Sequence, residues 1–364
     1  MFKLEGRPQP SKIMSLASPL IALGVTVLIG AGLFLWLGKD PLKGLEMFFY
    51  EPLKTTQALS ELAVKAVPLM LIALGLAVCF RSNIWNIGAE GQFLLGAVGG
   101  SWVAMQAGPH TGRWIVVLIL LAGALGGMFW SGIVALLKDR FNANEILVSL
   151  MLVYVGEMFL NYLVFGPWKD PNGYNFPQTI TFLPVTKIPR LMVGYRVNIG
   201  LLIALVAVVA FSIFLFRTFR GFQLQVGGLA PAAAKYAGFS SRAALWTALL
   251  LSGGMAGLAG ALEAAGPMGQ LTPYLSVGYG FAAIIVAFVG RLHPVGIVFS
   301  SLLMSLFYIG GELAQSRLGL PKAMTNVFQG LLLFTLLGCD TLIHNRLRWI
   351  GLARPKPHKG SEEA

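Results

Sequence analysis

The chain has 364 residues, of which 56% are hydrophobic and only 12% are charged, and its mean hydropathy is +0.73. This composition excludes an ordinary soluble domain, because several apolar runs approach the ~20 residues that cross a bilayer. The net charge of +12 comes largely from basic residues at the ends of apolar runs. That distribution is typical of membrane proteins, so it implies a lipid partner and not a nucleic acid. We predict an all-α polytopic membrane protein.

The N-terminal segment, residues 1–16, is basic and precedes an apolar run at Ala17–Leu37. This run has spanning length and ends near Trp36, an interfacial anchor, which favours a retained first span over a cleavable signal peptide. Residues 39–60 are mixed and aromatic and contain two prolines. They fit a segment lying on the membrane surface or an ordinary loop equally well.

Further apolar runs complete about ten predicted spans in one transmembrane domain covering residues 1–364. After the first span they are Leu62–Phe80, Gly91–Ala107, Trp114–Leu137, Glu145–Phe165, Val197–Phe216, Ala243–Ala265, Ser276–Val289, Pro294–Glu312 and Ala323–Gly338. The basic residues of the short connecting loops favour a cytoplasmic location for residues 1–16, 217–242 and 339–364. Both termini are therefore predicted to face the cytoplasm.

The stretch Cys79–Gly100 is polar where the surrounding chain is apolar. Because polar groups within a bilayer are tolerated only inside protein or beside a watery cavity, it predicts a functional interior. Glycines flank its carboxyl group and suit a broken or re-entrant helix. The alternative is a short cytoplasmic loop in which Glu90 complements the dipole of the next helix. The candidate residues for a translocation path or gate are Asn83, Asn86, Glu90 and Gln92.

A second interrupted segment, Tyr274–Pro294, gives the chain two weakly similar halves. Its apolar part, Ser276–Val289, is too short to cross a bilayer comfortably and has two glycines near its start. Paired interrupted segments in two halves indicate a central pathway between repeats, although chance similarity between Gly-rich apolar segments competes with this reading. We expect a second broken helix here.

The span Glu145–Phe165 carries two further polar candidates, Glu157 and Asn161. They are one helical turn apart, so they share a face that should point inward, where they either line the path or join helices. Small residues at four-residue spacing, such as Gly253 and Gly257, predict close helix packing.

The segment 217–242 contains a short predicted helix, Ala230–Tyr236, in which alanines follow a proline and a glycine comes after the end. A short exposed helix is not stable alone, so a soluble partner should dock on it. The residues we expect at that contact are Pro231, Ala233, Lys235, Tyr236 and Gly238.

Three motifs, NIWNIGAEGQFLLGA, LAPAAAKYAGFS and GYGFAAIIVAFVGRLHP, resemble the membrane permeases of bacterial ABC importers for nucleosides or simple sugars, the branch related to ribose and branched-chain amino-acid permeases. The resemblance covers most of residues 62–338. It implies a bacterial plasma-membrane complex containing a second permease, two cytoplasmic ABC ATPase subunits and an extracytoplasmic substrate-binding protein. By the same resemblance, Ala230–Gly238 is the coupling helix. Ala282 and Ala283 stand where relatives often carry acidic or hydroxyl residues, which puts polar substrate contacts in that half in doubt.

The sequence predicts no enzyme chemistry, no cofactor and no metal site. It lacks a phosphate-binding loop, and its histidines are scattered without ligand or nucleophile-base spacing. ATP hydrolysis is therefore expected on a partner. A self-contained secondary transporter of a small polar solute is the alternative, since broken helices and an intramembrane carboxyl group are equally expected there. An intramembrane enzyme would need a visible cluster of acids, bases or metal ligands.

Overall fold

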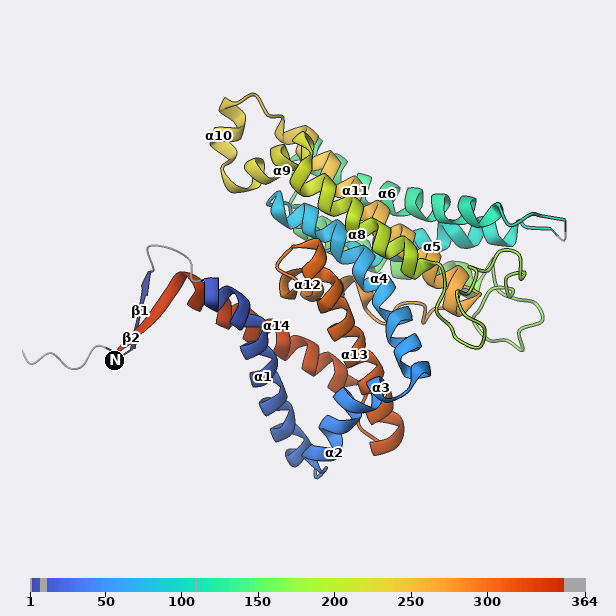
Figure 1. Cartoon of the computed structure of the whole chain (residues 1–364). Coiled ribbons are helices and arrows are strands. Elements are labelled where there is room, and N and C mark those ends of the chain that lie inside the picture. The colour runs from blue at the N-terminus through green and yellow to red at the C-terminus, as the bar shows by residue number, and fades with distance from the viewer. Residues whose placement is uncertain (1, 7–11, 109, 350–364) are drawn as a thin grey trace, which may run out of the picture. The chain divides into compact units, whose positions relative to one another are not determined.

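The computed structural model describes residues 2–6, 12–108 and 110–349, and it is helical, as predicted. The chain forms two compact units, one of residues 1–41 with 330–364 and one of residues 42–329 (Figure 1). The single permease domain expected over the whole chain stays a prediction.

The first unit joins the two ends of the chain. In it, the Thr26 and Thr335 hydroxyl groups share a hydrogen bond of 3.2 Å between two apolar helices. Two five-residue strands pair antiparallel, with Phe2 opposite Trp349. These strands were not predicted, because five residues without a hairpin turn give no local signal. The elements are β1 (Phe2–Gly6), α1 (Lys12–Trp36), the end of α14 (Ala323–His344) and β2 (Asn345–Trp349).

The second unit is a bundle of helices of unequal length. Its elements are α2 (Pro41–Leu45), the π-helix η1 (Glu46–Tyr50), α3 (Glu51–Lys54), α4 (Thr56–Arg81), α5 (Ala89–Met105), α6 (Ile115–Phe141), α7 (Glu145–Phe165), α8 (Gly200–Arg217), α9 (Phe219–Leu229), α10 (Pro231–Tyr236), α11 (Ser241–Glu263), the π-helix η2 (Ala264–Met268), α12 (Tyr279–Val289), α13 (Pro294–Leu318) and the start of α14.

Within the described residues, seven helices are long and apolar enough to cross a membrane: α1, α4, α6, α7, α8, α11 with η2, and α13. Two shorter apolar helices follow, α12 and the part of α14 at Ala323–Cys339. The predicted span at 91–107 is the 17-residue helix α5. The predicted count of about ten spans is not confirmed.

Helix α4 is the core of the second unit. Its residues from Ala66 to Cys79 are all buried, and it packs against α8, α11, α12 and α13. A helix that is apolar on every side is suited to this position, since no face has to meet water. The Thr55 hydroxyl accepts a hydrogen bond of 3.1 Å from the Ala58 N–H and caps its start.

Small residues let α5, α6 and α11 approach one another at backbone distance, as the sequence predicted. A Cβ atom added at Gly96 would lie 2.1 Å from the Gly257 Cα atom, and one added at Gly257 would lie 2.2 Å from the Gly123 carbonyl oxygen. Without a hydrophobic driving force between helices in lipid, such close van der Waals packing holds spans together. This three-helix contact fixes the position of α5, which carries Glu90.

We predict that Gly257→Ala destabilises the protein by about 1–3 kcal/mol, because the added methyl group has no space in this contact. Gly132→Ala is the matched control: its Cβ atom would meet only a Leu250 methyl group at 3.7 Å. This control should be neutral or stabilising by up to ~1 kcal/mol, because alanine favours a helix over glycine. Thermal unfolding of the purified protein in detergent measures the stability of both variants. Equal changes in their unfolding temperatures would contradict the packing argument.

Candidate functional site

The polar stretch after α4 is a real helix break. Helix α4 ends at Arg81, residues 82–88 are irregular, and α5 begins at Ala89. Asn83 is exposed and has a φ of 55°, a left-handed conformation that asparagine tolerates. A Cβ atom at Gly88 would lie 2.8 Å from the Ser149 carbonyl oxygen, so the break packs tightly on α7.

Asn86 and Gln92 are buried and bind each other. The Asn86 amide donates to Gln92 Oε1 at 3.0 Å, and the Gln92 amide donates back to Asn86 Oδ1 at 3.0 Å. Asn86 also donates to Ser252 Oγ of α11 at 3.0 Å and accepts from the Gly88 N–H at 3.1 Å. This network satisfies the polar groups inside the protein and fastens the break to α11.

Glu90 caps a second broken helix. Helix α12 starts inside the bundle, after an irregular segment at 269–278 and after Gly278, whose φ is 88°. The Gly280 N–H donates to Glu90 Oε2 at 2.5 Å. Ser276 Oγ accepts from the N–H groups of Gly278 at 3.2 Å and Tyr279 at 3.3 Å. The first N–H groups of a helix lack intrahelical partners and carry partial positive charge, so a carboxyl group is well placed there.

Helix α12 spans only part of a bilayer. Its 11 residues are about 16 Å long, roughly half of a hydrocarbon core. At its far end the ring of Phe288 stacks on Phe80 of α4 with centroids 5.1 Å apart. The chain then turns and returns along α13, where Ser300 Oγ donates to the Val286 carbonyl at 2.7 Å. The second broken helix expected from the sequence is therefore confirmed.

A cavity of about 370 Å³ lies beside this cap. Glu90, a residue only 3% exposed, contributes to its lining, and α7 contributes Glu157 and Asn161. The structure thus brings together three of the six candidate path residues, while Asn83, Asn86 and Gln92 do not line the cavity. Its lining residues are Glu90, Leu94, Glu157, Leu160, Asn161, Phe165, Pro273, Tyr274 and Ser276.

Sequence reasoning missed Phe165, Tyr274 and Ser276 as lining residues. Tyr274 and Ser276 lie in the irregular segment before α12, whose glycines and aromatic residues predict a broken helix but not a cavity lining. The sequence signal that could have identified them is a tyrosine ring and a serine hydroxyl group a few residues before the start of a helix. Ala282 and Ala283 are both buried and do not line this cavity, so the absence of polar side chains there removes no contact from it.

The short helix predicted at 230–236 is α10, Pro231–Tyr236. Ala234 is buried, whereas Ala233, Lys235 and Tyr236 are exposed, Tyr236 to 97%. Gly238 has a φ of 77°, which lets the chain turn toward α11.

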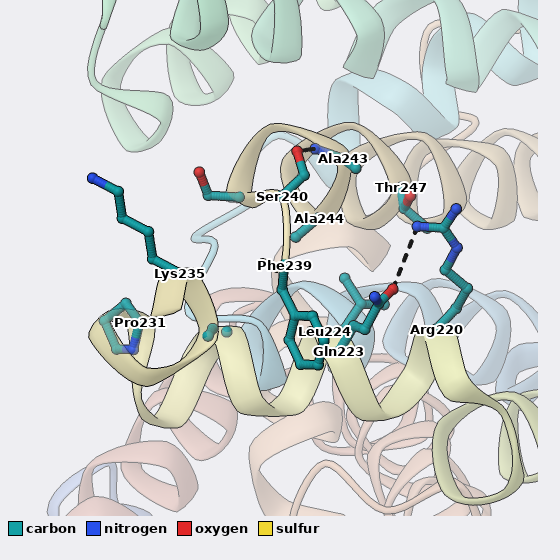
Figure 2. Close-up of a pocket in the computed structure, with 13 residues that line it drawn as sticks. Arg220, Gln223, Leu224, Pro231, Lys235, Phe239, Ser240, Ala243, Ala244 and Thr247 are labelled. Atoms are coloured by element: carbon teal, nitrogen blue, oxygen red, sulfur yellow. Dashed lines mark hydrogen bonds between the residues drawn. The ribbon is translucent and has the colours of Figure 1, made fainter. Parts of the chain in front are cut away.

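Figure 2 shows how α10 is held against its neighbours. Phe239 points toward α9, and its ring lies 5.9 Å from that of Phe219 and 6.3 Å from that of Phe222. A small pocket of about 70 Å³ lies among α9, α10 and the start of α11. The exposed side of α10 carries Ala233, Lys235 and Tyr236.

Comparison with known proteins identifies the family. The sequence profile for the permease component of branched-chain amino acid transport systems matches residues 58–337. The chain belongs to this permease family. The matched range contains both helix breaks, the cavity and α10, so the resemblance read from the three motifs is confirmed.

The permease is 32% identical to a glucose ABC transporter permease of Haloferax volcanii, over 92% of this chain and 90% of that protein. It is 28% identical to a nucleoside ABC transporter permease of Lactococcus lactis, over 89% of this chain and 91% of that protein. A solved ABC transporter in an inward-facing conformation has a TM-score of 0.45 and 17% identity, over 88% of this chain and 97% of that chain. The family match and the two permease relatives show that the protein is a permease subunit of an ABC transporter.

The cap on α12 leads to a prediction. Glu90→Ala leaves the Gly280 N–H without its acceptor and should destabilise the permease by about 1–3 kcal/mol. Glu90→Gln keeps an oxygen acceptor and should lose less. Hydrogen exchange of the first α12 amides, together with thermal unfolding, measures the effect.

Glu157→Ala is the control, since it removes a carboxyl group from the same cavity but not from the cap. Equal protection of the α12 amides in Glu90→Ala and in the unmodified protein would show that the carboxyl group does not hold this helix.

Proposed function

We propose that this permease carries a nucleoside, or a simple sugar as the second candidate, through the cavity beside α12. The observation that supports this is the cavity lining. Two carboxyl groups and an amide can accept hydrogen bonds from hydroxyl groups, and the rings of Phe165 and Tyr274 offer faces for a base or a sugar ring. Among the described lining residues none is basic, so a phosphorylated solute would meet repulsion without a compensating cation.

A second permease is proposed to complete the pathway on the α7 side. Glu157 lies within a span and is exposed, as are the neighbouring apolar residues Tyr154, Met158 and Tyr162. A carboxyl group facing lipid in the middle of a span is costly. A facing permease would shelter Glu157 in a polar path and cover the apolar residues beside it.

The α10 end of the bundle is proposed to face the cytoplasm and to bind the ATPase. Basic residues lie at the ends of α6 and α8 and near the starts of α9 and α11, as a cytoplasmic end requires: Lys138, Arg140, Arg217, Arg220 and Arg242. Arg242 forms an ion pair of 2.7 Å with Asp139, which joins the start of α11 to the end of α6. This ion pair stabilises the end of the bundle at which α10 lies. Both chain termini are also proposed to face the cytoplasm, because of the basic residues in the short connecting loops.

The opposite end is proposed to receive the substrate-binding protein. Two ion pairs lie at this end: Arg196 with Glu61 at 3.0 Å, and Lys65 with Glu312 at 3.1 Å. A hollow of about 520 Å³ opens between the starts of α3 and α4 and the end of α13. A charged rim of this kind suits a partner that must dock and leave, because exposed charges favour rapid association. The complex is proposed to reside in the plasma membrane.

Transport is tested with the complete complex in lipid vesicles. We expect ATP-dependent uptake of radiolabelled uridine that excess uridine monophosphate does not inhibit. Glu157→Ala should lower uptake by about ten-fold, the effect of losing one hydrogen bond to a charged group. Glu145→Ala, at the start of the same helix and paired with Lys138, is the control that should keep uptake. Uptake of glucose alone would favour the second candidate, and inhibition by the phosphate ester would contradict the reading of the lining.

Docking of the ATPase is tested on α10. Tyr236→Ala and Ala233→Arg should each weaken binding by about 2 kcal/mol or more, the scale of an interface hot spot, because both residues are exposed on the free side of the helix. Tyr174→Ala, at a 93% exposed position in another loop, is the matched control. Co-purification of the ATPase measures the effect. Normal docking in both α10 variants would move the ATPase site elsewhere.

A further inference from the structure

Arg81, the last residue of α4, joins two parts of the permease that are far apart in sequence. Its Nε atom donates to the Leu292 carbonyl at 2.8 Å, and its Nη1 atom donates to Gln225 Oε1 at 3.1 Å. Its guanidinium carbon lies 5.0 Å from the centre of the Phe216 ring. Arg81 is partly buried, and the N–H donors of its guanidinium group bind acceptors in two different parts of the protein.

One of these directions leads to α10. Gln225 lies on α9, and its amide donates to the Leu215 carbonyl of α8 at 2.6 Å. Near the end of α9, a Cβ atom at Gly228 would lie 2.2 Å from the Arg81 carbonyl oxygen, so the two backbones touch. Ala230 is at once the last cap of α9 and the first cap of α10. A single short helix, α9, therefore connects α10 to Arg81.

The other direction leads to the cavity. Leu292 lies in the turn between α12 and α13, where Arg291 and Leu292 have φ values of 55° and 52°. The Leu292 N–H donates to the Ala287 carbonyl at 2.8 Å, which ties this turn to the last part of α12. The first part of α12 is the end that Glu90 and Ser276 hold beside the cavity. Arg81 thus binds the turn at one end of α12, and the other end of α12 borders the proposed path.

We propose that Arg81 is a positioning residue that transmits movement of α10 to α12 and so to the cavity. The inference rests on the proposed function, since it needs an ATPase on α10 and a path beside α12. An arginine that only anchored a helix end in lipid would extend its guanidinium group to the membrane–water interface. Arg81 instead directs charge-assisted hydrogen bonds, which are roughly twice as strong as neutral ones, to α9 and to the turn after α12. A short discrete contact of this kind can hold one of two arrangements of a helix.

The test uses the complete permease–ATPase complex in nanodiscs and a reporter cysteine at Tyr274, which lines the cavity and is 79% exposed. Cys339 is replaced by serine, and Cys79 is buried. Labelling of the reporter by a soluble maleimide is compared without nucleotide and with ATP plus vanadate. We expect the labelling rate to change by about ten-fold or more in the parent protein and by less than about two-fold in Arg81→Gln, with the ATPase still bound and hydrolysing ATP.

Three further variants sharpen the result. Gln225→Ala should reduce the nucleotide-dependent change as Arg81→Gln does, and it decides the question where Arg81→Gln does not assemble. Arg81→Lys should also fail, because an ammonium group lacks the fork that reaches both acceptors. Arg140→Gln, at an exposed arginine of the same end, should keep the full change.

The outcomes separate the two proposals. A nucleotide-dependent change that persists in both Arg81→Gln and Gln225→Ala would overturn the role of Arg81 and leave the proposed function intact. No change in the parent protein, or no ATPase in the purified complex, would overturn the proposed function and this inference with it.

Discussion

A bilayer offers the backbone no hydrogen-bond partner, so each helix that begins inside it needs protein groups for its first N–H donors. Helix α12 is such a helix, and Glu90 and Ser276 supply its acceptors. This cap lets an irregular segment enter the bundle and line a cavity. Without it, the first N–H groups of α12 would be buried without acceptors, which is costly inside a bilayer. The intramembrane carboxyl group is therefore first a structural partner of the backbone, and its exposure to the cavity follows from that position.

The cap works only because α5 is held where its carboxyl group meets α12. Glycines bring α5, α6 and α11 into backbone contact, and Gly280 lets α12 approach Glu90 so closely that an added Cβ atom would lie 2.2 Å from its nitrogen. The buried pair of Asn86 and Gln92 fastens the preceding break to Ser252. Close packing through small residues and hydrogen-bonded amide side chains thus hold the polar interior in one arrangement.

The permease places its two kinds of contact at different depths. The cavity uses groups inside the bundle, where a low dielectric strengthens hydrogen bonds. Helix α10, the proposed docking helix, lies at one end and exposes Tyr236 almost fully. Between them lies the contact of Arg81 with Gln225 and with the Leu292 carbonyl. The arrangement suits a permease subunit that, as we propose, responds to an ATPase bound at α10.

Local sequence determined the apolar helices, the two helix breaks and α10, because length, glycines and caps act over a few residues. It also singled out Glu90, Glu157 and Asn161, since polar residues in spans are rare. Tertiary structure decided which of the polar residues share a cavity. Asn86 and Gln92 have the same local signature as Glu90, yet they bind each other, and Tyr274 and Ser276 join the cavity from a segment nearly 190 residues from Glu90. Such partnerships depend on how helices pack, and no local pattern carries that information.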